Sequence, residues 1–555
     1  MHAVSDTAKT DIPILIAGGG PIGLALAADL GRRGVPTMLI EAREDKLASP
    51  KMLEVGMRTM EFCRQLGIAK DVRNWGFPFD WPLDSVFVTT LTGYELGRVR
   101  TPSLGEQSSN GHSPERSMCC PQTWFDPILQ RSARSFPHIA LRYRTKLESF
   151  VQDPDGVTAM LVDQRTGKSE TVRAAYLVGC DGFASTVREQ LGIAVRGEPH
   201  IDWSMTVYLR IRNLSQYHDK GNAMRYVFVG PNGTWSFLST IDGKDCWRQQ
   251  LIGLDREKLE KTDIADVMRR AFGREIPYTV DDVTMWVRKM TVADRFMDGR
   301  VFLAGDSAHA HPPNGGLGMN TGIQDSFDLG WKLAAMVQGW GGTNLMESYD
   351  IERRPASARA NLVSLGNFRR LNAAPPNTAI NDPTPEGEAI RRAAGARLVE
   401  ENEKSWHPVG VHLGYIYQPS PIVVPDGTPM PEDDTFGYKP TTYPGARAPH
   451  VWLTNDRSTL DFYGSGFALL SFDGARTDGF ERAAALRRVP LAVHRIAHHD
   501  AAEIYAKRLV LVRPDGHVAW RGDEAPRDPM AIIDTVRGAG PRIAARRAAE
   551  ANRPA

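Results

Sequence analysis

Three glycines near the N-terminus have the spacing of a dinucleotide-binding turn. Gly18, Gly20 and Gly23 directly follow the apolar run Ile12-Pro-Ile-Leu-Ile-Ala17. A turn of this kind lets the backbone approach a pyrophosphate at the positive end of the next helix. Glu41 ends the following apolar run, 18 residues after Gly23, where a carboxylate can accept hydrogen bonds from a ribose. The pattern predicts a site for NAD or FAD and does not distinguish between them.

A second pattern places a carboxylate before a glycine-rich loop. The apolar run Val301-Phe-Leu-Ala304 leads into Gly305-Asp306, and the loop His311-Pro-Pro-Asn-Gly-Gly-Leu-Gly-Met-Asn320 follows. Asp306 would therefore lie at the carboxyl end of a parallel strand, where α/β sheets bind ligands. The glycines allow a flat group to lie against the backbone, and a positive helix end there favours an anionic edge such as that of a reduced flavin. We predict that this helix begins at Thr321, because Thr321 and Gln324 have the spacing of a capping box.

A third strand-like run, Tyr176-Leu-Val-Gly179, also ends at an acidic residue. Asp181 follows it, and Ser185 and Arg188 lie at the start of the next predicted helix. All three motifs need a parallel strand before the turn and a helix after it, so they predict an α/β fold. Because they lie far apart along the chain, the domain that they build must be discontinuous in sequence.

Changes in residue pattern predict five parts of the chain. They are a discontinuous nucleotide-binding domain (11–74, 119–194 and 296–372), a substrate-binding β-sheet domain (75–118 and 195–295), a linker and arm (373–444), a C-terminal unit (445–540) and a flexible tail (541–555). The β-sheet domain has alternating β-type runs, and Tyr226, Trp235 and Trp247 are candidates for the walls of its substrate pocket. Each of the three is equally well explained as ordinary strand core.

Composition excludes several classes of protein. The 555 residues carry 67 Lys plus Arg and 66 Asp plus Glu, a net charge of +1, which gives no electrostatic footprint for nucleic acid or an anionic membrane. Five cysteines without a Cys-x-x-Cys pair argue against a disulfide framework and indicate a reducing, cytoplasmic location. The uncharged run 12–28 contains three glycines and a proline, which favours a strand–turn–helix over a membrane span. No histidine cluster has a third ligand at a credible spacing, so we expect no metal site.

In this order, the motifs resemble those of the class A flavoprotein aromatic hydroxylases, which include phenol 2-monooxygenase, chlorophenol hydroxylase and polyketide hydroxylases. The resemblance is carried by Cys-Asp-Gly-x-x-Ser-x-Val-Arg at 180–188 and by the segment 305–325, and it extends through Tyr349-Asp-Ile-Glu-Arg-Arg-Pro355. It implies a Rossmann-like FAD-binding domain, a β-sheet substrate domain and a C-terminal thioredoxin-like domain. No cysteine follows Cys246, so that last domain cannot perform thiol redox chemistry.

The resemblance also implies roles for individual residues. Those that would hold FAD through its ADP half, its ribityl chain or its ring are Gly18, Gly20, Gly23, Glu41, Gln122, Asp181, Asp306, Gly316, Leu317, Gly318, Met319 and Asn320. Asp181 belongs to a motif that is linked in the family to the nicotinamide cofactor as well. Pro312 and Pro313 would lie beside the reacting carbon of the flavin ring. Where relatives commonly have an arginine near the flavin, this chain has Lys51, which keeps the charge but loses the bidentate fork.

The implied reaction is ring hydroxylation. NADH or NADPH reduces FAD, O₂ forms a C4a-hydroperoxyflavin, and the distal oxygen attacks a phenol or another electron-rich aromatic compound. The sequence does not identify a catalytic base, a substrate or an oligomeric state, although a homodimer is one expectation. Two alternatives stay open: epoxidation or Baeyer–Villiger oxidation of a polyketide or heteroaromatic compound, and a binding protein that retains the fold without turnover.

Overall fold

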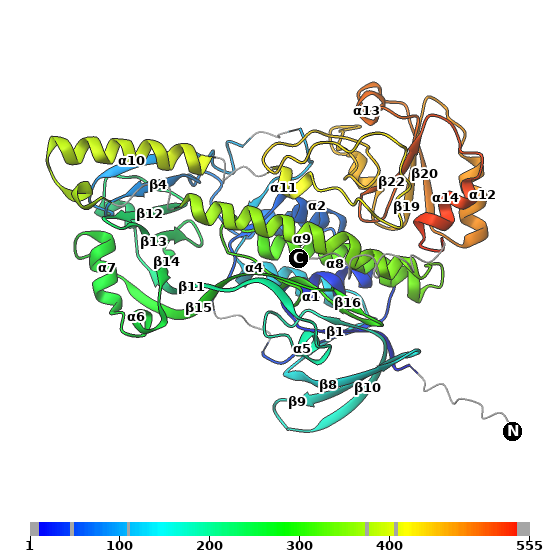
Figure 1. The fold of residues 1–555 in the computed structure, drawn as a ribbon, viewed down its shortest axis with the longest axis horizontal. Helices are drawn as coiled ribbons and strands as arrows, with labels where there is room; N and C mark the ends of the chain where they lie inside the picture. Colours follow the sequence, from blue (N-terminus) through cyan, green and yellow to red (C-terminus); the bar gives the residue numbers. More distant parts are fainter. Residues whose placement is uncertain (1–9, 45–48, 108–110, 372–376, 404–408, 541–555) are drawn as a thin grey trace, which may run out of the picture.

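A computed structural model describes residues 10–44, 49–107, 111–371, 377–403 and 409–540. The predicted tail, 541–555, lies outside these ranges. The described residues form two eight-stranded sheets, a four-stranded C-terminal sheet and a two-stranded pair. In Figure 1 the long helices α8 (Leu317–Val337) and α9 (Asn344–Arg370) run through the middle of the molecule, with the second sheet at one end and the C-terminal unit at the other.

The first sheet has a parallel centre that brings the three sequence motifs to one edge. Its strands are β16 (Met297–Asp298), β17 (Val301–Leu303), β10 (Ser169–Gly179), β1 (Ile12–Ala17), β2 (Thr37–Glu41) and β7 (Ile139–Tyr143) in spatial order, with β8 (Thr145–Asp153) and β9 (Gly156–Asp163) beyond β10. β1 pairs in parallel with β2 and β10, and β10 pairs in parallel with β17. The carboxyl ends of β1, β10 and β17 therefore meet, which places Gly18, Asp181 and Gly305 side by side.

Helices of the first domain pack on this sheet and on one another. They are α1 (Pro21–Arg32), α2 (Met57–Gln65), α3 (Ala69–Arg73), α4 (Gln122–Arg134) and α5 (Thr186–Gln190), together with α8 and α9; the short strands β3 (Glu54–Val55) and β6 (Met118–Cys119) pair beside them. The predicted start of α8 at Thr321 is wrong. The helix begins four residues earlier at Leu317, because Gly316 takes the left-handed conformation (φ 65°) that a glycine adopts without strain and acts as the N-cap.

The second sheet has two chemically different faces. Its spatial order is β18 (His309–Ala310), β15 (Thr279–Ala293), β11 (Val195–Arg210), β14 (Cys246–Leu254), β13 (Gly233–Thr240), β12 (Arg225–Gly230), β4 (Ser85–Val88) and β5 (Glu95–Val99). One face packs against α6 (Arg256–Glu260) and α7 (Ile264–Phe272) in an apolar cluster that includes Val207, Leu238 and Met268. Since strand side chains alternate between faces, the intervening residues point toward the first domain.

The C-terminal unit is a four-stranded sheet with helices around it. The strand order is β20 (Leu491–Ile496), β19 (Phe467–Phe472), β21 (Leu509–Val512) and β22 (Val518–Gly522), and the helices are α12 (Asp478–Arg487), α13 (His499–Tyr505) and α14 (Pro529–Val536). Between this unit and α9 lie α10 (Pro385–Glu403), which packs on the second sheet through Ala394 and Leu398, and α11 (Val409–Leu413). All five cysteines are free thiols.

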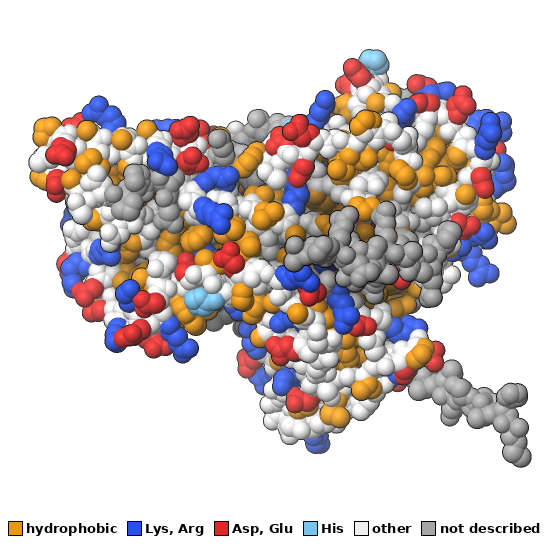
Figure 2. Space-filling view, in the orientation of Figure 1, with side chains coloured by type: hydrophobic (Ala, Val, Ile, Leu, Met, Phe, Trp, Pro, Cys, Tyr) orange, Lys and Arg blue, Asp and Glu red, His pale blue; other side chains and the backbone are white. Residues whose placement is uncertain are grey.

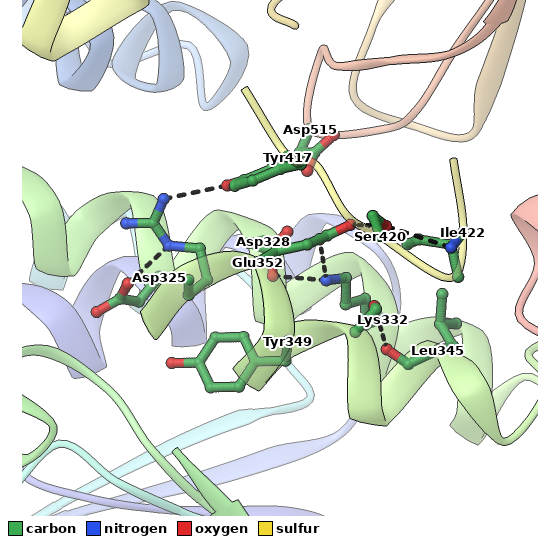
Figure 3. A network of polar contacts seen from close by, with 12 residues as sticks. Asp325, Asp328, Lys332, Leu345, Tyr349, Glu352, Tyr417, Ser420, Ile422 and Asp515 are labelled. Atoms are coloured by element: carbon green, nitrogen blue, oxygen red, sulfur yellow. Dashed lines mark hydrogen bonds and ion pairs between the residues drawn. The ribbon is translucent and has the colours of Figure 1, made fainter. Parts of the chain in front are cut away.

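Buried ion pairs attach the C-terminal unit to the first domain. Figure 3 shows Asp328, Lys332 and Glu352 of α8 and α9 beneath Asp515 and Tyr417. Arg513 donates to Glu352 (2.6 Å) and to Asp328 (2.9 Å), and Lys332 lies 2.7 Å from both carboxylates. Burial makes such groups expensive unless they are paired, so these contacts require the two units to dock in one orientation.

The face of the molecule drawn in Figure 2 has no large field of one sign. In the view of Figure 2, acidic and basic side chains are interspersed over the whole face, which fits the net charge of +1. Within the described ranges, no helix combines the length and the apolar composition that crossing a bilayer requires.

Candidate active site

A cavity of about 2170 Å³ lies between the carboxyl edge of the first sheet and the second sheet. Its walls include the turn after β1, the segment 51–54, the loop 310–316 and the strands β11 to β15. Pockets for a single drug-sized ligand are about 300–1,000 Å³. The cavity therefore has room for a dinucleotide and a second molecule together.

The glycine turn fits a pyrophosphate. Gly18 has φ +114°, and a Cβ there would lie 2.2 Å from the carbonyl oxygen of Cys180, so no other residue fits. A Cβ at Gly20 would meet nothing within 4 Å, since this position faces the open cavity. Gly20 is also the N-cap of α1 and provides no side-chain acceptor, which leaves the start of the helix available to an anion.

Glu41 and Gly23 shape this turn in different ways. Glu41 lines the cavity, and its Oε2 accepts a hydrogen bond from the backbone N–H of Gly19 at 2.8 Å. A Cβ at Gly23 would lie 2.0 Å from the carbonyl oxygen of Gly18. Gly23 therefore allows α1 to pack tightly under the turn and does not itself line the cavity.

Asp306 lies where the sequence predicts, at the end of β17. Its side chain is exposed to the cavity, and burial within the protein raises its pKa, which His309 and Lys51 oppose. Lys51 and Gln122 also line the cavity, and the Gln122 amide donates to Asp126 at 3.0 Å. Burial raises the pKa of Asp126 to about 7. These groups form a polar strip along one side of the cavity.

The loop before α8 and the first turn of that helix form part of the cavity wall. Pro312, Pro313, Gly316, Gly318 and Met319 line it. The guanidinium of Arg288, on β15, donates to the side-chain oxygen of Asn314 at 2.6 Å, which fastens the loop to the second sheet.

Two residues of the first turn of α8 do not face the cavity. Leu317 is buried with Ala360, Val363 and Val411. The Asn320 side chain accepts from Gly56 N–H and the Thr59 hydroxyl (both 2.7 Å) and donates to two backbone carbonyl oxygens, those of Glu54 and Gly316. These four bonds use the whole capacity of an amide, so Asn320 fixes α8 against α2, and only its backbone is left for a ligand.

Two acidic residues, one in the cavity wall and one behind it, hold neighbouring groups in place. Asp181 lines the cavity, but its carboxylate accepts from the Ser185 hydroxyl at 2.6 Å and from Val187 N–H at 3.1 Å; burial raises its pKa. Fully buried Asp325 accepts from His309 at 2.6 Å and from Arg353 at 2.8 Å.

The prediction that three aromatic residues form the walls of the substrate pocket is wrong. Tyr226 and Trp247 are about 1% exposed and belong to the apolar cluster under α6 and α7, on the opposite face of the sheet. A register shift between Phe228 and Val229 leaves Trp235 without a partner on the next strand. Its side chain therefore turns away from the cavity and packs against the same cluster.

The cavity-facing side chains of the sheet are instead largely polar. They come from alternate positions of five strands: Thr206, Tyr208, Arg225, Val227, Phe237, Ser239, Arg248, Gln250, Thr284 and Trp286. Period-2 alternation identifies such a set, but only once it is known which face a helix covers. Within the described ranges, no group of three or more His, Cys, Asp or Glu residues is arranged to hold a metal ion.

Comparison with known proteins identifies the family. Residues 11–362 match the FAD binding domain family model, and residues 441–539 match the aromatic-ring hydroxylase C-terminal model. The chain belongs to the FAD-dependent aromatic-ring hydroxylases. The predicted fold class is confirmed, and the protein is a flavoprotein monooxygenase whose cofactor is FAD.

Individual members of the family align with almost the whole chain. A putative polyketide hydroxylase of Streptomyces halstedii is 33% identical over 94% of this chain and 96% of its own length. A 2,4-dichlorophenol 6-monooxygenase of Delftia acidovorans is 31% identical over 94% of this chain and 96% of its own length. The structure of the rebeccamycin biosynthetic enzyme RebC with reduced flavin is 37% identical, with a TM-score of 0.88 over 95% of this chain and 99% of that one.

Proposed function

We propose that this hydroxylase uses NADH or NADPH and O₂ to add one oxygen atom to a phenolic or otherwise electron-rich aromatic compound. One observation carries the proposal. A single cavity joins the glycine turn and Asp306 to the polar face of the second sheet, and Pro312 and Pro313 also line it. A cofactor held at one end can therefore meet an organic substrate held at the other.

The proposed roles follow from the positions of the residues. The turn at Gly18 and Gly20 would hold the pyrophosphate, Glu41 the ribose, and Asp306 the ribityl chain, while the backbone of 315–320 would support the ring. Bound FAD supplies the redox chemistry, because it takes two electrons from NAD(P)H and passes them to O₂. The balanced reaction consumes one NAD(P)H, one proton and one O₂, and releases NAD(P)⁺ and water.

The protein's own contribution would be to position the ring and exclude water. Thr206, Tyr208 and Thr284 offer hydroxyl groups that could bind a substrate hydroxyl, while Phe237 and Trp286 offer flat apolar contact. His311 lines the same cavity and stays neutral, because burial, and then the neighbouring His309, hold its pKa well below the ordinary value.

Activity on polyketides is the second candidate, and the similarity to the Streptomyces halstedii enzyme favours it. The test is NADH and NADPH oxidation by the yellow holoenzyme across phenols and polycyclic quinones, with mass analysis of each product. We expect at least one aromatic compound to accelerate oxidation and to gain 16 mass units at a ring carbon. Lactone or epoxide products would select the alternative. Flavin reduction without any oxygenated product would contradict the proposal.

A cytoplasmic location and a homodimer stay predictions. Fractionation of the producing cells and light scattering of the purified holoenzyme test them.

A further inference from the structure

A row of paired residues crosses the cavity-facing side of the second sheet. The strand registers pair Arg225 with Ser239, Ser239 with Arg248, and Arg248 with Tyr208. Directly paired residues project from the same face of a sheet, so the two arginines stand on one face with a single strand between them, about 10 Å apart at the backbone. Both line the cavity.

The charge of Arg248 is not balanced by the protein. Among the described residues no carboxylate acts on its charge, and its Nε is buried without a hydrogen-bond partner. Burial lowers the pKa of Arg248 to about 10, against a small opposing effect of Tyr208. Tyr208 cannot neutralise it, because its own hydroxyl donates to the Pro50 carbonyl oxygen at 3.0 Å. A desolvated cation of this kind is costly unless an anion joins it.

The charges around Arg248 leave the row positive. Burial and the repulsion of Arg248 lower the pKa of Arg225 to about 9, and the carboxyl group of Glu54 opposes this. Burial raises the pKa of Glu54 itself. Asp282 extends the row beyond Tyr208, but its carboxylate accepts from the Ser49 hydroxyl at 2.6 Å and does not offset the charge of either arginine. Glu54 therefore acts on Arg225, whereas no carboxylate among the described residues offsets the charge of Arg248.

This positive row begins beside the loop that precedes α8. A Cβ built on Gly316 would lie 3.5 Å from Glu54 Oε2, and Glu54 in turn acts on Arg225. The apolar side chains Val227 and Phe237 line the cavity from the same strands as the arginines and Ser239. A flat molecule between the loop and the sheet could thus place a substituent at the row while its ring contacts apolar atoms.

We propose that Arg248 and Arg225 bind a carboxylate carried by the aromatic substrate, so that the substrate of this hydroxylase is an aromatic acid. The inference rests on the proposed function for the identity of the reaction, but the anion site is defined by the cavity alone. A guanidinium fork matches a carboxylate in two parallel hydrogen bonds, which a neutral phenol or ketone does not offer.

The test compares three probes that differ in one group: 6-hydroxy-2-naphthoate, its primary amide, and 2-naphthol. Binding to the oxidised holoenzyme is measured by the change in the visible spectrum of the flavin, for wild type, Arg248→Gln and Arg248→Lys. Arg210→Gln is the matched control, because Arg210 lies on the same sheet but pairs with Asp281 at the surface. We expect the acid to bind about 10- to 100-fold more tightly than the amide. Arg248→Gln should remove that preference, Arg248→Lys should keep part of it, and Arg210→Gln should keep all of it.

The following results would contradict the proposed carboxylate site or the proposed reaction. Equal binding of acid and amide, binding of neither, or an equal loss for both in Arg248→Gln would overturn the anion site. If 2-naphthol binds more tightly once the pH is high enough to ionise its hydroxyl, the two arginines bind a phenolate. That result would overturn the proposal that they bind a carboxylate. Product mass is read separately. An acid that binds through Arg248 but gains no oxygen would contradict the proposed hydroxylation and leave the site standing.

Discussion

Glu61 of α2 connects the first domain to the C-terminal unit through a buried ion cluster. It accepts from Arg58 at 2.5 Å, from Arg447 at 2.5 and 3.1 Å, and from the Ser113 hydroxyl at 2.6 Å. Burial opposes its ionisation, but Arg447 and then Arg58 outweigh this and lower its pKa from 4.5 to about 2. A change of that size corresponds to about 3 kcal/mol, which agrees with the ~3–5 kcal/mol lost when one partner of a buried pair is removed.

Glu61→Gln should therefore weaken the docking of the C-terminal unit. A chain with several domains does not unfold in two states, so we would measure native-state hydrogen exchange of the amides in β21. At pH 7 the exchange rates of the most protected amides should rise by roughly a hundredfold. Because the folded pKa is the lower one, the stabilisation is complete above pH 4.5 and is lost as the pH falls toward 2, and the variant should lack this dependence.

Arg487→Gln provides the control for this experiment. Arg487 pairs with Asp534 at the surface of the same unit, and its removal should leave the rates almost unchanged. Exchange in Glu61→Gln within twofold of wild type at pH 7 would refute the assignment of this cluster as the docking contact.

Three further variants test the cofactor end of the cavity. Asp306→Ala should yield folded protein with little bound FAD, since no hydrogen bond within the described structure depends on its carboxylate; a normal ratio of flavin to protein absorbance would contradict this. Gly20→Val should also fold, because a Cβ there meets nothing within 4 Å, but its side chain should block the pyrophosphate; retention of FAD would place the pyrophosphate elsewhere. Asp325→Asn should leave buried Arg353 and His309 without their carboxylate and lower the thermal unfolding temperature; unchanged unfolding would show that the cluster is not stabilising.

Local chemistry made much of the cofactor end predictable. Gly18 must be glycine because of its positive φ, and Gly20 because a ligand needs the space beside it. The apolar run before Asp306 is typical of a buried parallel strand. The start of α8 was not predictable in this way, because Thr321 offers a good capping pattern while Gly316 takes a conformation that sequence does not reveal.

The substrate end depended on long-range packing. Tyr226 and Trp247 are residue types that often line ligand pockets. They lie instead on the face of the sheet that α6 and α7 cover, away from the cavity. The contact between Glu61 and Arg447 joins residues 386 positions apart, and no local pattern marks it. Arg225 and Arg248 likewise become neighbours only through the strand register.

The central claim is that one atom of O₂ enters an aromatic ring in this cavity. The most direct test is turnover of the holoenzyme with NAD(P)H, the best aromatic compound of the panel and ¹⁸O₂, followed by mass analysis of the product. The account predicts a hydroxylated ring that carries one ¹⁸O atom, with one NAD(P)H consumed for each product. An oxygen derived from water, or NAD(P)H oxidation that yields only hydrogen peroxide with every aromatic compound tested, would contradict it.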